Sequence, residues 1–233
     1  MDSIIGTLQA IGIFLVGLVA RIGVVLLVMA LLLAPVMLLV GAMKGWSELR
    51  LRLLGFRHAG GFLFRQGIYY APGHTWLKPV GNSLRVGLDD LAQRILPWAV
   101  AVDLPRAGTA VKAGDRLATI SCGKQQVSIA APVDGTVVSV NPAVARNPSL
   151  VKTESYTRGW LFALTPADKR WLQMPSGEEA RSWLAAEGHR LNRFFETQLG
   201  IATADGGEWI APPPTLLSDE QWKALEKAFL ARR

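Results

Sequence analysis

The sequence predicts a mainly β domain, a small sandwich or flattened barrel, with an N-terminal transmembrane helix and a C-terminal helical tail. Three observations predict this arrangement. The first part of the chain contains a long apolar run, the middle alternates short β-rich runs with glycine and proline, and the last part has helical periodicity. Hydrophobic residues make up 50% of the 233 residues, and they are concentrated near the N-terminus.

The uncharged run from Ile22 to Met43 is the candidate membrane span. As an α-helix it would be about 33 Å long, enough to cross a hydrocarbon core of about 30 Å. The stretch from Ile4 to Ala20 is also apolar, so one long helix through Arg21 is the simplest form, and a two-helix hairpin turning near Arg21 is the alternative. Pro35 would kink this helix rather than end it. A cleaved signal peptide fits poorly, because no basic residue precedes the apolar stretch.

Positive charge is concentrated after the span. The basic residues after the span are Lys44, Arg50, Arg52, Arg57 and Arg65, whereas only Asp2 is charged ahead of Arg21. Such an excess marks the cytoplasmic side, so we expect a single-pass protein of the cytoplasmic (inner) membrane whose soluble domain faces the cytoplasm. The net charge of +7 suits anionic lipid headgroups. Residues 1–45 form the anchor, and residues 46–61 form an amphipathic juxtamembrane segment along the membrane surface.

Residues 62–168 have the sequence pattern of a β domain. The β-rich runs are SLRVGL, AVAVDLP, DRLATIS, QVSIAAP, GTVVSVN and GWLFALT, and turn residues separate them. One short helix interrupts this pattern from Asp89 to Ile95, with Asp89 as its N-cap. The residues expected in the core are Trp76, Val86, Leu104, Ile129, Val138 and Trp160.

Residues 169–233 form a helical tail with a proline-rich linker over 201–217. Ser218 to Gln221 is a capping box that opens the last helix. Trp222, Leu225 and Phe229 share one face of that helix, because their spacing follows the helical repeat. We expect this face to pack either on the β domain or on a partner protein.

The run TISCGKQQVSIAAP, residues 119–132, predicts a β-hairpin with Lys124 exposed at its tip. The expected arms are residues 117–121 and 127–131, which carry apolar residues at alternate positions. Gly108 and Gly135 flank this region and suit turns that need a positive φ. A tip lysine suits a modifying enzyme, or a swinging-arm cofactor that must reach several partners. The alternative is an ordinary solvated turn lysine.

Five phrases of the sequence occur together in a recognisable order. They are YYAPGHTW (69–76), RVGLDDLAQRIL (85–96), VAVDLPRAGTAVKAGDRLATI (100–120), APVDGTVVSVN (131–141) and NPSLVKTESYTRGWLFALTPAD (147–168). This stretch, Tyr69 to Asp168, resembles the H protein of the glycine cleavage system, a lipoyl-carrying hammerhead domain. The resemblance implies a lipoyl-like β sandwich and a lipoate joined by an amide to Lys124, the position of the family's lipoyl-lysine. It also implies a carrier rather than an enzyme.

The sequence departs from that family immediately around Lys124. The acidic residue that precedes the family's lysine, and that lipoylating enzymes recognise, is missing from the run Ile120-Ser121-Cys122-Gly123. The resemblance therefore also leaves room for a degenerate domain that keeps the fold without the lipoate. Biotin is disfavoured as the attached group, because methionines do not flank Lys124.

Other chemically active residues form no recognisable catalytic or metal-binding pattern. Cys122 is the only cysteine, which rules out an internal disulfide and argues against a cysteine-based zinc site. It is either a thiol with a pKa lowered by Lys124 or a small packed residue. His74 and Trp76 match the family's His-x-Trp pair, which the resemblance marks as structural. The aspartates Asp89, Asp90 and Asp103 have no partner at a spacing that suggests acid–base catalysis.

Two hypotheses follow for the function. In the first, the chain is a membrane-tethered, H-protein-like carrier or accessory subunit that serves a membrane enzyme or redox complex on the cytoplasmic face. In the second, it is a non-lipoylated structural scaffold in a membrane assembly. Both predict membrane lipids and a protein in a membrane complex as partners, and neither predicts a small-molecule substrate. Nucleic acid is disfavoured as a partner, because no basic platform rich in aromatic residues occurs.

Overall fold

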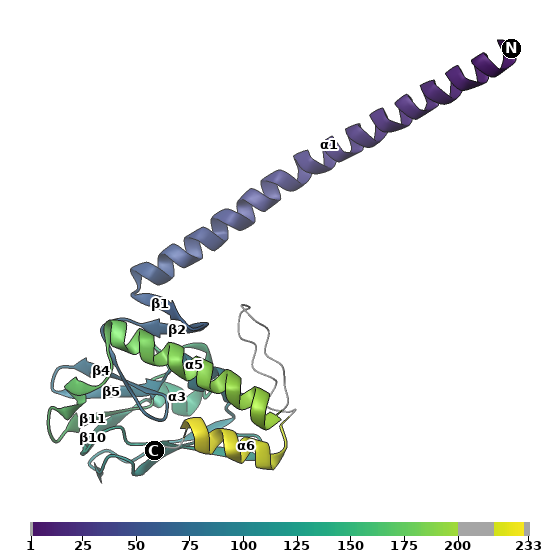
Figure 1. Cartoon of the computed structure of the whole chain (residues 1–233). Helices are drawn as coiled ribbons and strands as arrows, with labels where there is room; N and C mark the ends of the chain where they lie inside the picture. Colours follow the sequence, from purple (N-terminus) through teal and green to yellow (C-terminus); the bar gives the residue numbers. More distant parts are fainter. Residues whose placement is uncertain (1, 200–216, 231–233) are drawn as a thin grey trace. The chain divides into compact units, whose positions relative to one another are not determined.

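The computed structural model describes residues 2–199 and 217–230 and divides the chain into two compact units (Figure 1). The first unit is Met1–Leu54 and the second is Gly55–Arg233. The expected proline-rich linker over 201–217 lies almost entirely outside the described residues.

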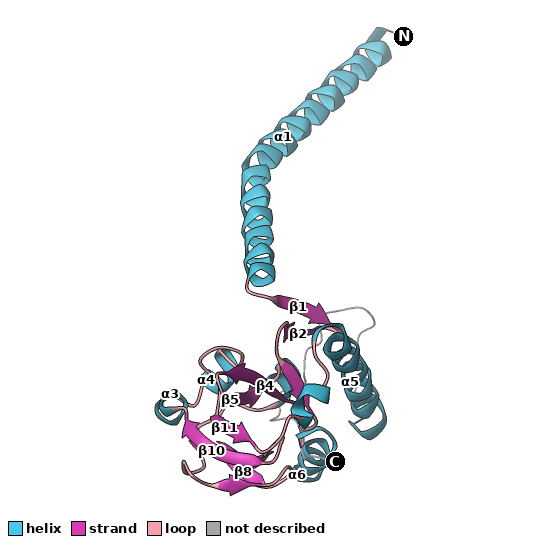
Figure 2. Cartoon of the chain, turned by 90° about the vertical axis from the view of Figure 1, so that its left-hand side faces the viewer, coloured by secondary structure: helices cyan, strands magenta, loops and turns pink. Residues whose placement is uncertain are grey.

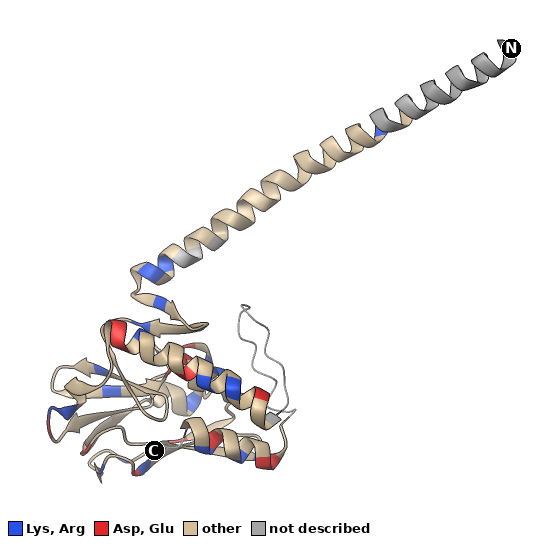
Figure 3. Ribbon diagram, viewed as in Figure 1, with Lys and Arg blue, Asp and Glu red and all other residues tan. Residues whose placement is uncertain are grey.

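The first unit is a single helix, α1 (Asp2–Leu53), that runs through Arg21 without a turn. The structure therefore has the one-helix form rather than the hairpin near Arg21. Pro35 lies inside α1, and Figure 2 shows the helix bending along its length without ending. Arg21–Met43 is long and apolar enough to cross a membrane, with a mean hydropathy of 3.0. Figure 3 shows most of this stretch in tan, with basic residues at the last turn of α1, where Arg50 and Arg52 lie.

Residues 46–61 do not form the separate segment expected from the sequence. Residues up to Leu53 continue α1, and the chain then forms an antiparallel hairpin of β1 (Phe56–Ala59) and β2 (Phe62–Arg65). Gly60 and Gly61 make its turn, with φ values of 55° and 84°, and positive φ at both central residues is what a type I′ hairpin turn requires. The hairpin aromatics Phe62 and Phe64 are buried, so this hairpin belongs to the core of the second unit.

Besides the β1–β2 hairpin, two antiparallel sheets form the framework of the second unit, which confirms the mainly β fold. The six-stranded sheet has the order β3-β4-β5-β11-β10-β7, and the three-stranded sheet has the order β6-β8-β9. The larger sheet consists of β3 (Tyr69–Ala71), β4 (Thr75–Val80), β5 (Ser83–Leu88), β7 (Ala110–Val111), β10 (Gly135–Val140) and β11 (Phe162–Pro166). The smaller consists of β6 (Ala101–Asp103), β8 (Arg116–Cys122) and β9 (Gln125–Ala130). Figure 2 shows these strands in magenta.

Helices close the domain at its edges. They are α2 (Asp90–Ile95), α3 (Pro142–Arg146), α4 (Leu150–Thr153), the 3-10 turn η1 (Arg170–Gln173), α5 (Gly177–Leu199), α6 (Asp219–Leu225) and the π-helical stretch η3 (Glu226–Leu230). Asp89 caps α2 as expected, because its Oδ1 accepts a hydrogen bond from the Ala92 amide at 2.9 Å. The capping box at Ser218 and Gln221 is also present.

Helix α5 packs directly on the β1–β2 hairpin. A Cβ placed on Gly60 would come within 2.8 Å of the Ala185 Cα, and one on Gly188 within 2.9 Å of the Phe62 ring. These approaches are closer than ordinary van der Waals contact, so each glycine allows the backbone of one element to touch the other. The hairpin is thereby joined to the helix that begins the C-terminal tail.

The expected core is only partly correct. Trp76, Val86 and Ile129 are buried, whereas Leu104 and Trp160 are half-buried. Val138 was assigned to the wrong face: it is 46% exposed, and its neighbour Val137 is fully buried. The physical reason is a β-bulge between Val137 and Ser139, where the register against β11 shifts. A bulge inserts one residue into the strand, so the alternation of inward and outward side chains changes phase there.

Candidate functional site

Lys124 lies at the tip of a tight hairpin, as the sequence predicts. Strands β8 and β9 pair from Arg116–Ala130 to Cys122–Gln125, and Gly123 and Lys124 form the two-residue turn. Gly123 has a φ of 65°, whereas the φ of Lys124 is not positive. This is the φ pattern of a type II′ turn, in which glycine takes the first central position. Lys124 is exposed, and among the described residues no hydrogen bond or ion pair engages it.

The arms of this hairpin hold its tip in place by alternate burial. The inward side chains are Ala118, Ile120 and Cys122 on β8 and Val127 and Ile129 on β9, and all five are buried. Towards the tip the outward positions Thr119, Ser121, Gln126 and Ser128 are polar, and Thr119 pairs with Ser128 across the two strands. Because one face is packed and the other is wet, a slip of one residue would bury polar groups. The register that places Lys124 at the turn is therefore strongly specified.

An apolar surface that the sequence did not single out lies beside the Lys124 hairpin. The Val100 amide donates to the Ser121 carbonyl at 2.8 Å, so the segment Pro97–Val100 runs along β8. Trp98 is 60% exposed and Val100 is 64% exposed. The Lys152 ammonium lies 5.8 Å from the centre of the Trp98 ring. No periodic signal marked this surface, because it lies in the short loop between α2 and β6.

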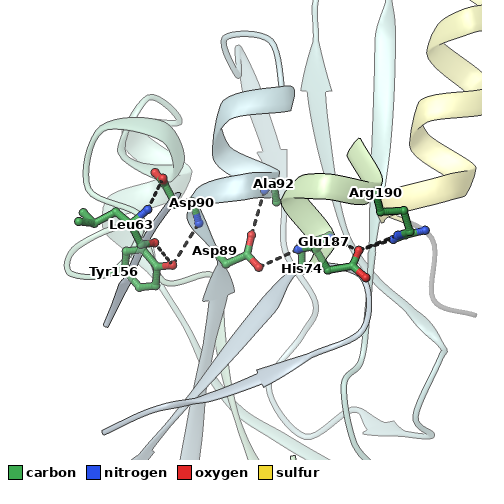
Figure 4. Close-up of polar contacts among 8 residues, drawn as sticks. All are labelled: Leu63, His74, Asp89, Asp90, Ala92, Tyr156, Glu187 and Arg190. Carbon is green, nitrogen blue, oxygen red and sulfur yellow. Dashed lines mark hydrogen bonds and ion pairs between the residues drawn. The ribbon is translucent and has the colours of Figure 1, made fainter. Parts of the chain in front are cut away.

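A second polar centre is buried around His74 (Figure 4). The Nδ1 atom of His74 lies 2.8 Å from Oδ2 of Asp89, and its Nε2 atom lies 3.4 Å from Oε2 of Glu187. Glu187 in turn accepts from Arg190 on the same helix, with Nε at 2.9 Å. His74 is 1% exposed, and its backbone has a φ of 56°, which residues other than glycine rarely adopt. The network joins the β3–β4 turn, the start of α2 and helix α5.

The two carboxylates keep this histidine protonated. Burial alone lowers the pKa of His74, but Asp89 and then Glu187 outweigh it and raise the pKa to about 9. Burial would raise the pKa of Glu187, whereas hydrogen bonds from His74 and Arg190 bring it below its usual value. The centre is therefore an ionic clamp between elements. His74 has little surface from which to act on a substrate, which agrees with its expected structural role.

Asp90 and Tyr156 fix the first hairpin of the unit to α2. Oδ2 of Asp90 accepts from the Leu63 amide at 2.7 Å, and its backbone amide donates to the Tyr156 hydroxyl at 3.1 Å. That hydroxyl donates to the Leu63 carbonyl at 2.9 Å, which closes a ring of hydrogen bonds (Figure 4). Asp90 also pairs with Arg94 at 3.0 Å. The aspartates that the sequence left without partners thus have structural ones, except Asp103.

The similarity to known proteins covers this same part of the chain. The family described as glycine cleavage H-protein matches residues 68–187, about half of the chain. The chain belongs to the glycine cleavage H-protein family. A glycine cleavage system H protein of Micrococcus luteus is 40% identical over 110 residues, which cover 46% of this chain and 86% of that protein. H protein 1 of Caldanaerobacter subterraneus subsp. tengcongensis is 38% identical over 120 residues, 51% of this chain and 95% of that protein.

A solved structure was also found. The crystal structure of a glycine cleavage system H protein from Mycobacterium marinum aligns with 29% identity and a TM-score of 0.42, covering 45% of this chain and 87% of that one.

The H-protein match includes the Lys124 hairpin and the His74 centre but not the ends of the chain. Helix α1, the β1–β2 hairpin and the α6–η3 segment all lie outside residues 68–187. The α6–η3 segment packs on the H-protein domain: Trp222, Leu225 and Phe229 are buried, as the shared face predicts. Arg190 donates to the Ala228 carbonyl at 3.0 Å, and its guanidinium lies 4.2 Å from the Phe229 ring centre. The ring of Phe229 faces His74 at 6.2 Å, across a pocket of about 320 Å³.

Cys122 is a packed residue rather than a reactive thiol within this H-protein domain. It is 6% exposed, and its thiol lies 3.7 Å from the Pro97 carbonyl oxygen. Burial raises the pKa of Cys122 to about 11, and the nearby Lys152 only partly offsets this. Of the two interpretations that the sequence left open, the small packed residue is the correct one, because Cys122 points into the core while Lys124 lies on the exposed turn. Among the described residues, no group of three potential ligands could hold a metal ion.

Proposed function

We propose that this protein is a membrane-tethered carrier of the H-protein type, with a lipoyl group on Lys124, that serves an enzyme or redox complex at the cytoplasmic face of the inner membrane. The observation that supports this most directly is the place of Lys124. It is the exposed tip residue of a hairpin whose arms are packed and whose register is specified. Family membership supports the same assignment, because the relatives are glycine cleavage system H proteins.

The turn fits an acyl arm on chemical grounds. Lys124 offers a primary amine on an exposed side chain, and among the described residues no hydrogen bond or ion pair engages it. An amide at Nζ would therefore add a long arm without displacing any packed side chain. When attached, a lipoyl group supplies a dithiolane that can take up electrons or a one-carbon amine. The residues of this chain present that arm, and a partner supplies the catalytic groups.

The anchor explains why such a carrier would gain from being tethered. If Arg21–Met43 spans the bilayer, the carrier diffuses in two dimensions beside a membrane-bound partner. Tethering raises the effective concentration of the arm at the partner's active site without any new contact. The partner we propose is accordingly a protein of a membrane complex, and the lipids around the helix are the second partner.

Intact mass tests the proposed modification. Protein purified from its native host, with its lipoate enzymes intact, should carry the additional mass of one amide-linked lipoyl group. Lys124→Arg should abolish that mass and leave the melting temperature nearly unchanged, because an exposed tip residue contributes little to stability. Lys112→Arg is the matched control, since Lys112 is another exposed lysine, with 82% side-chain exposure, and should keep the full added mass.

A scaffold without lipoate is the second candidate, and two observations favour it. The run before Lys124 contains no acidic residue, and Trp98 and Val100 expose an apolar surface beside the hairpin. Such a surface is a candidate protein contact that would not need a modified lysine. If protein from the native host has only the unmodified mass, the carrier proposal fails and the scaffold proposal stands.

A further inference from the structure

Three basic side chains gather on the β2–β4–β5 part of the second unit with no acidic partner. Lys78 on β4 and Arg85 on β5 lie directly opposite each other in the antiparallel register. Arg65 at the end of β2 is the third, and its charge acts on Lys78 together with that of Arg85. Within residues 2–199 and 217–230, none of the three forms an ion pair.

This arrangement costs stability in the isolated domain. Like charges directly opposite on neighbouring strands repel each other. Burial and then the two guanidinium groups lower the pKa of Lys78, and no carboxylate is among the causes. The fold nevertheless orients the two guanidinium groups. The Arg85 guanidinium lies 4.9 Å from the Trp160 ring centre, and the Arg65 guanidinium lies 5.6 Å from the Phe56 ring centre and donates to the Tyr156 carbonyl at 3.0 Å.

The chain itself connects this cluster to the anchor. Helix α1 ends at Leu53, and Phe56, which begins β1, pairs with Arg65. Ten helical residues beyond Met43 would extend about 15 Å, and the headgroup layer occupies roughly 5–8 Å of that distance. The start of the hairpin is therefore held within about one Debye length of the headgroups, ~8 Å at physiological salt.

We propose that Arg65, Lys78 and Arg85 form a docking patch for anionic lipid headgroups, which holds the tethered H-protein domain against the bilayer surface. This inference rests on the proposed function, because it requires α1 to span the membrane. Each basic side chain near an anionic surface contributes about 1 kcal/mol, and the tether supplies the high local concentration that makes so weak an attraction effective. Headgroup phosphates would also relieve the repulsion between Lys78 and Arg85.

Lysine acetylation of the full-length protein in vesicles tests the patch, because Lys78 reports on it directly. The rate at Lys78 is normalised to that at exposed Lys112 and compared between vesicles of phosphatidylcholine alone and vesicles that also contain phosphatidylglycerol. The anionic lipid should slow acetylation of Lys78 about fivefold, the factor that corresponds to ~1 kcal/mol. High salt should remove the protection, because it screens exposed charges.

The double variant Arg65→Gln/Arg85→Gln should lose this protection. The control Arg106→Gln/Arg116→Gln removes the same charge from two exposed residues elsewhere in the domain and should keep it. Equal labelling of Lys78 in both kinds of vesicle would overturn the patch, whether the rate is slow in both or fast in both. Alkaline carbonate extraction separates the failure of the patch from the failure of the membrane span. Protein that stays in the membrane but shows equal labelling refutes only the patch. Protein that is released from the membrane refutes the span and the patch with it.

Discussion

At the scale of single residues, His74 shows how burial and charge compete. A buried imidazole favours the neutral form, yet two carboxylates on different elements reverse this preference. The result is a protonated histidine at neutral pH. It forms ion pairs with Asp89 at the start of α2 and with Glu187 on α5. These ion pairs contribute to the stability of the fold, since the atoms that His74 contacts are those of Asp89 and Glu187.

Stability should therefore depend on pH in a defined direction. The pKa of His74 is raised from 6.5 to about 9, so its contribution is fully present below pH 6.5 and is lost as pH rises through 9. Glu187 has a lowered pKa, so its contribution is present above 4.5 and is lost as pH falls. The free energy of unfolding should fall by up to roughly 3 kcal/mol between pH 6.5 and pH 9, the limits of the His74 transition. Urea unfolding of the detergent-solubilised protein, followed by tryptophan fluorescence, measures this loss.

The variant His74→Gln should flatten this alkaline loss, because glutamine keeps a hydrogen bond to Asp89 without a titrating proton. The exposed His189 provides the control, and His189→Gln should follow the unmodified protein across the whole range. An alkaline decline that persists unchanged in His74→Gln would show that another group causes it.

At the scale of elements, the bulge in β10 decides which valine enters the core. The register shift between Val137 and Ser139 turns Val137 inward and Val138 outward. Val137→Ala should therefore cost about 2 kcal/mol in unfolding free energy, since it removes buried methyl groups and leaves a cavity. Val138→Ala should change it by less than about 0.5 kcal/mol. Equal losses in the two variants would contradict the burial of Val137 and the exposure of Val138.

The last helical segment is held to the H-protein domain by few contacts, and Phe229 is central to them. It packs against Phe194 at 5.7 Å between ring centres and lies under the Arg190 guanidinium. Phe229→Ala should release α6 and η3, because truncation of a buried phenylalanine costs about 3–5 kcal/mol. Amide hydrogen exchange over residues 219–230 should then speed up strongly while the β8–β9 hairpin keeps its protection. The exposed Lys223 offers the control Lys223→Ala, for which slow exchange over 219–230 should remain.

At the scale of the whole molecule, the anchor and the carrier domain are separate units with separate tests. The basic residues after the span predict that everything beyond Met43 lies in the cytoplasm. A reporter enzyme that is active only outside the cytoplasm, fused after Arg233, should therefore be silent in cells. A reporter active only inside the cytoplasm should work at the same site, which controls for expression. The reverse pair of results would contradict the predicted orientation.

The sequence alone was sufficient wherever the determining interactions are local. The uncharged run sets the length of the candidate span, and alternation with a glycine sets the hairpin that exposes Lys124. The N-cap at Asp89 and the capping box at Ser218 likewise depend on atoms within a few residues of each other. These features appear in the printed sequence because their hydrogen bonds and burial patterns repeat with the period of one element.

Only the tertiary structure decided which distant residues meet. Asp90 and Tyr156 are 66 positions apart, and Arg65 and Tyr156 are 91 apart, so no local period relates them. The same holds for the His74 clamp, for the face of Val138 and for the burial that raises the pKa of Cys122. The basic patch of Arg65, Lys78 and Arg85 also depends on the pairing of β4 with β5, which places Lys78 opposite Arg85. Such contacts depend on how sheets and helices pack in space, and packing depends on all the elements at once rather than on any one stretch of the chain.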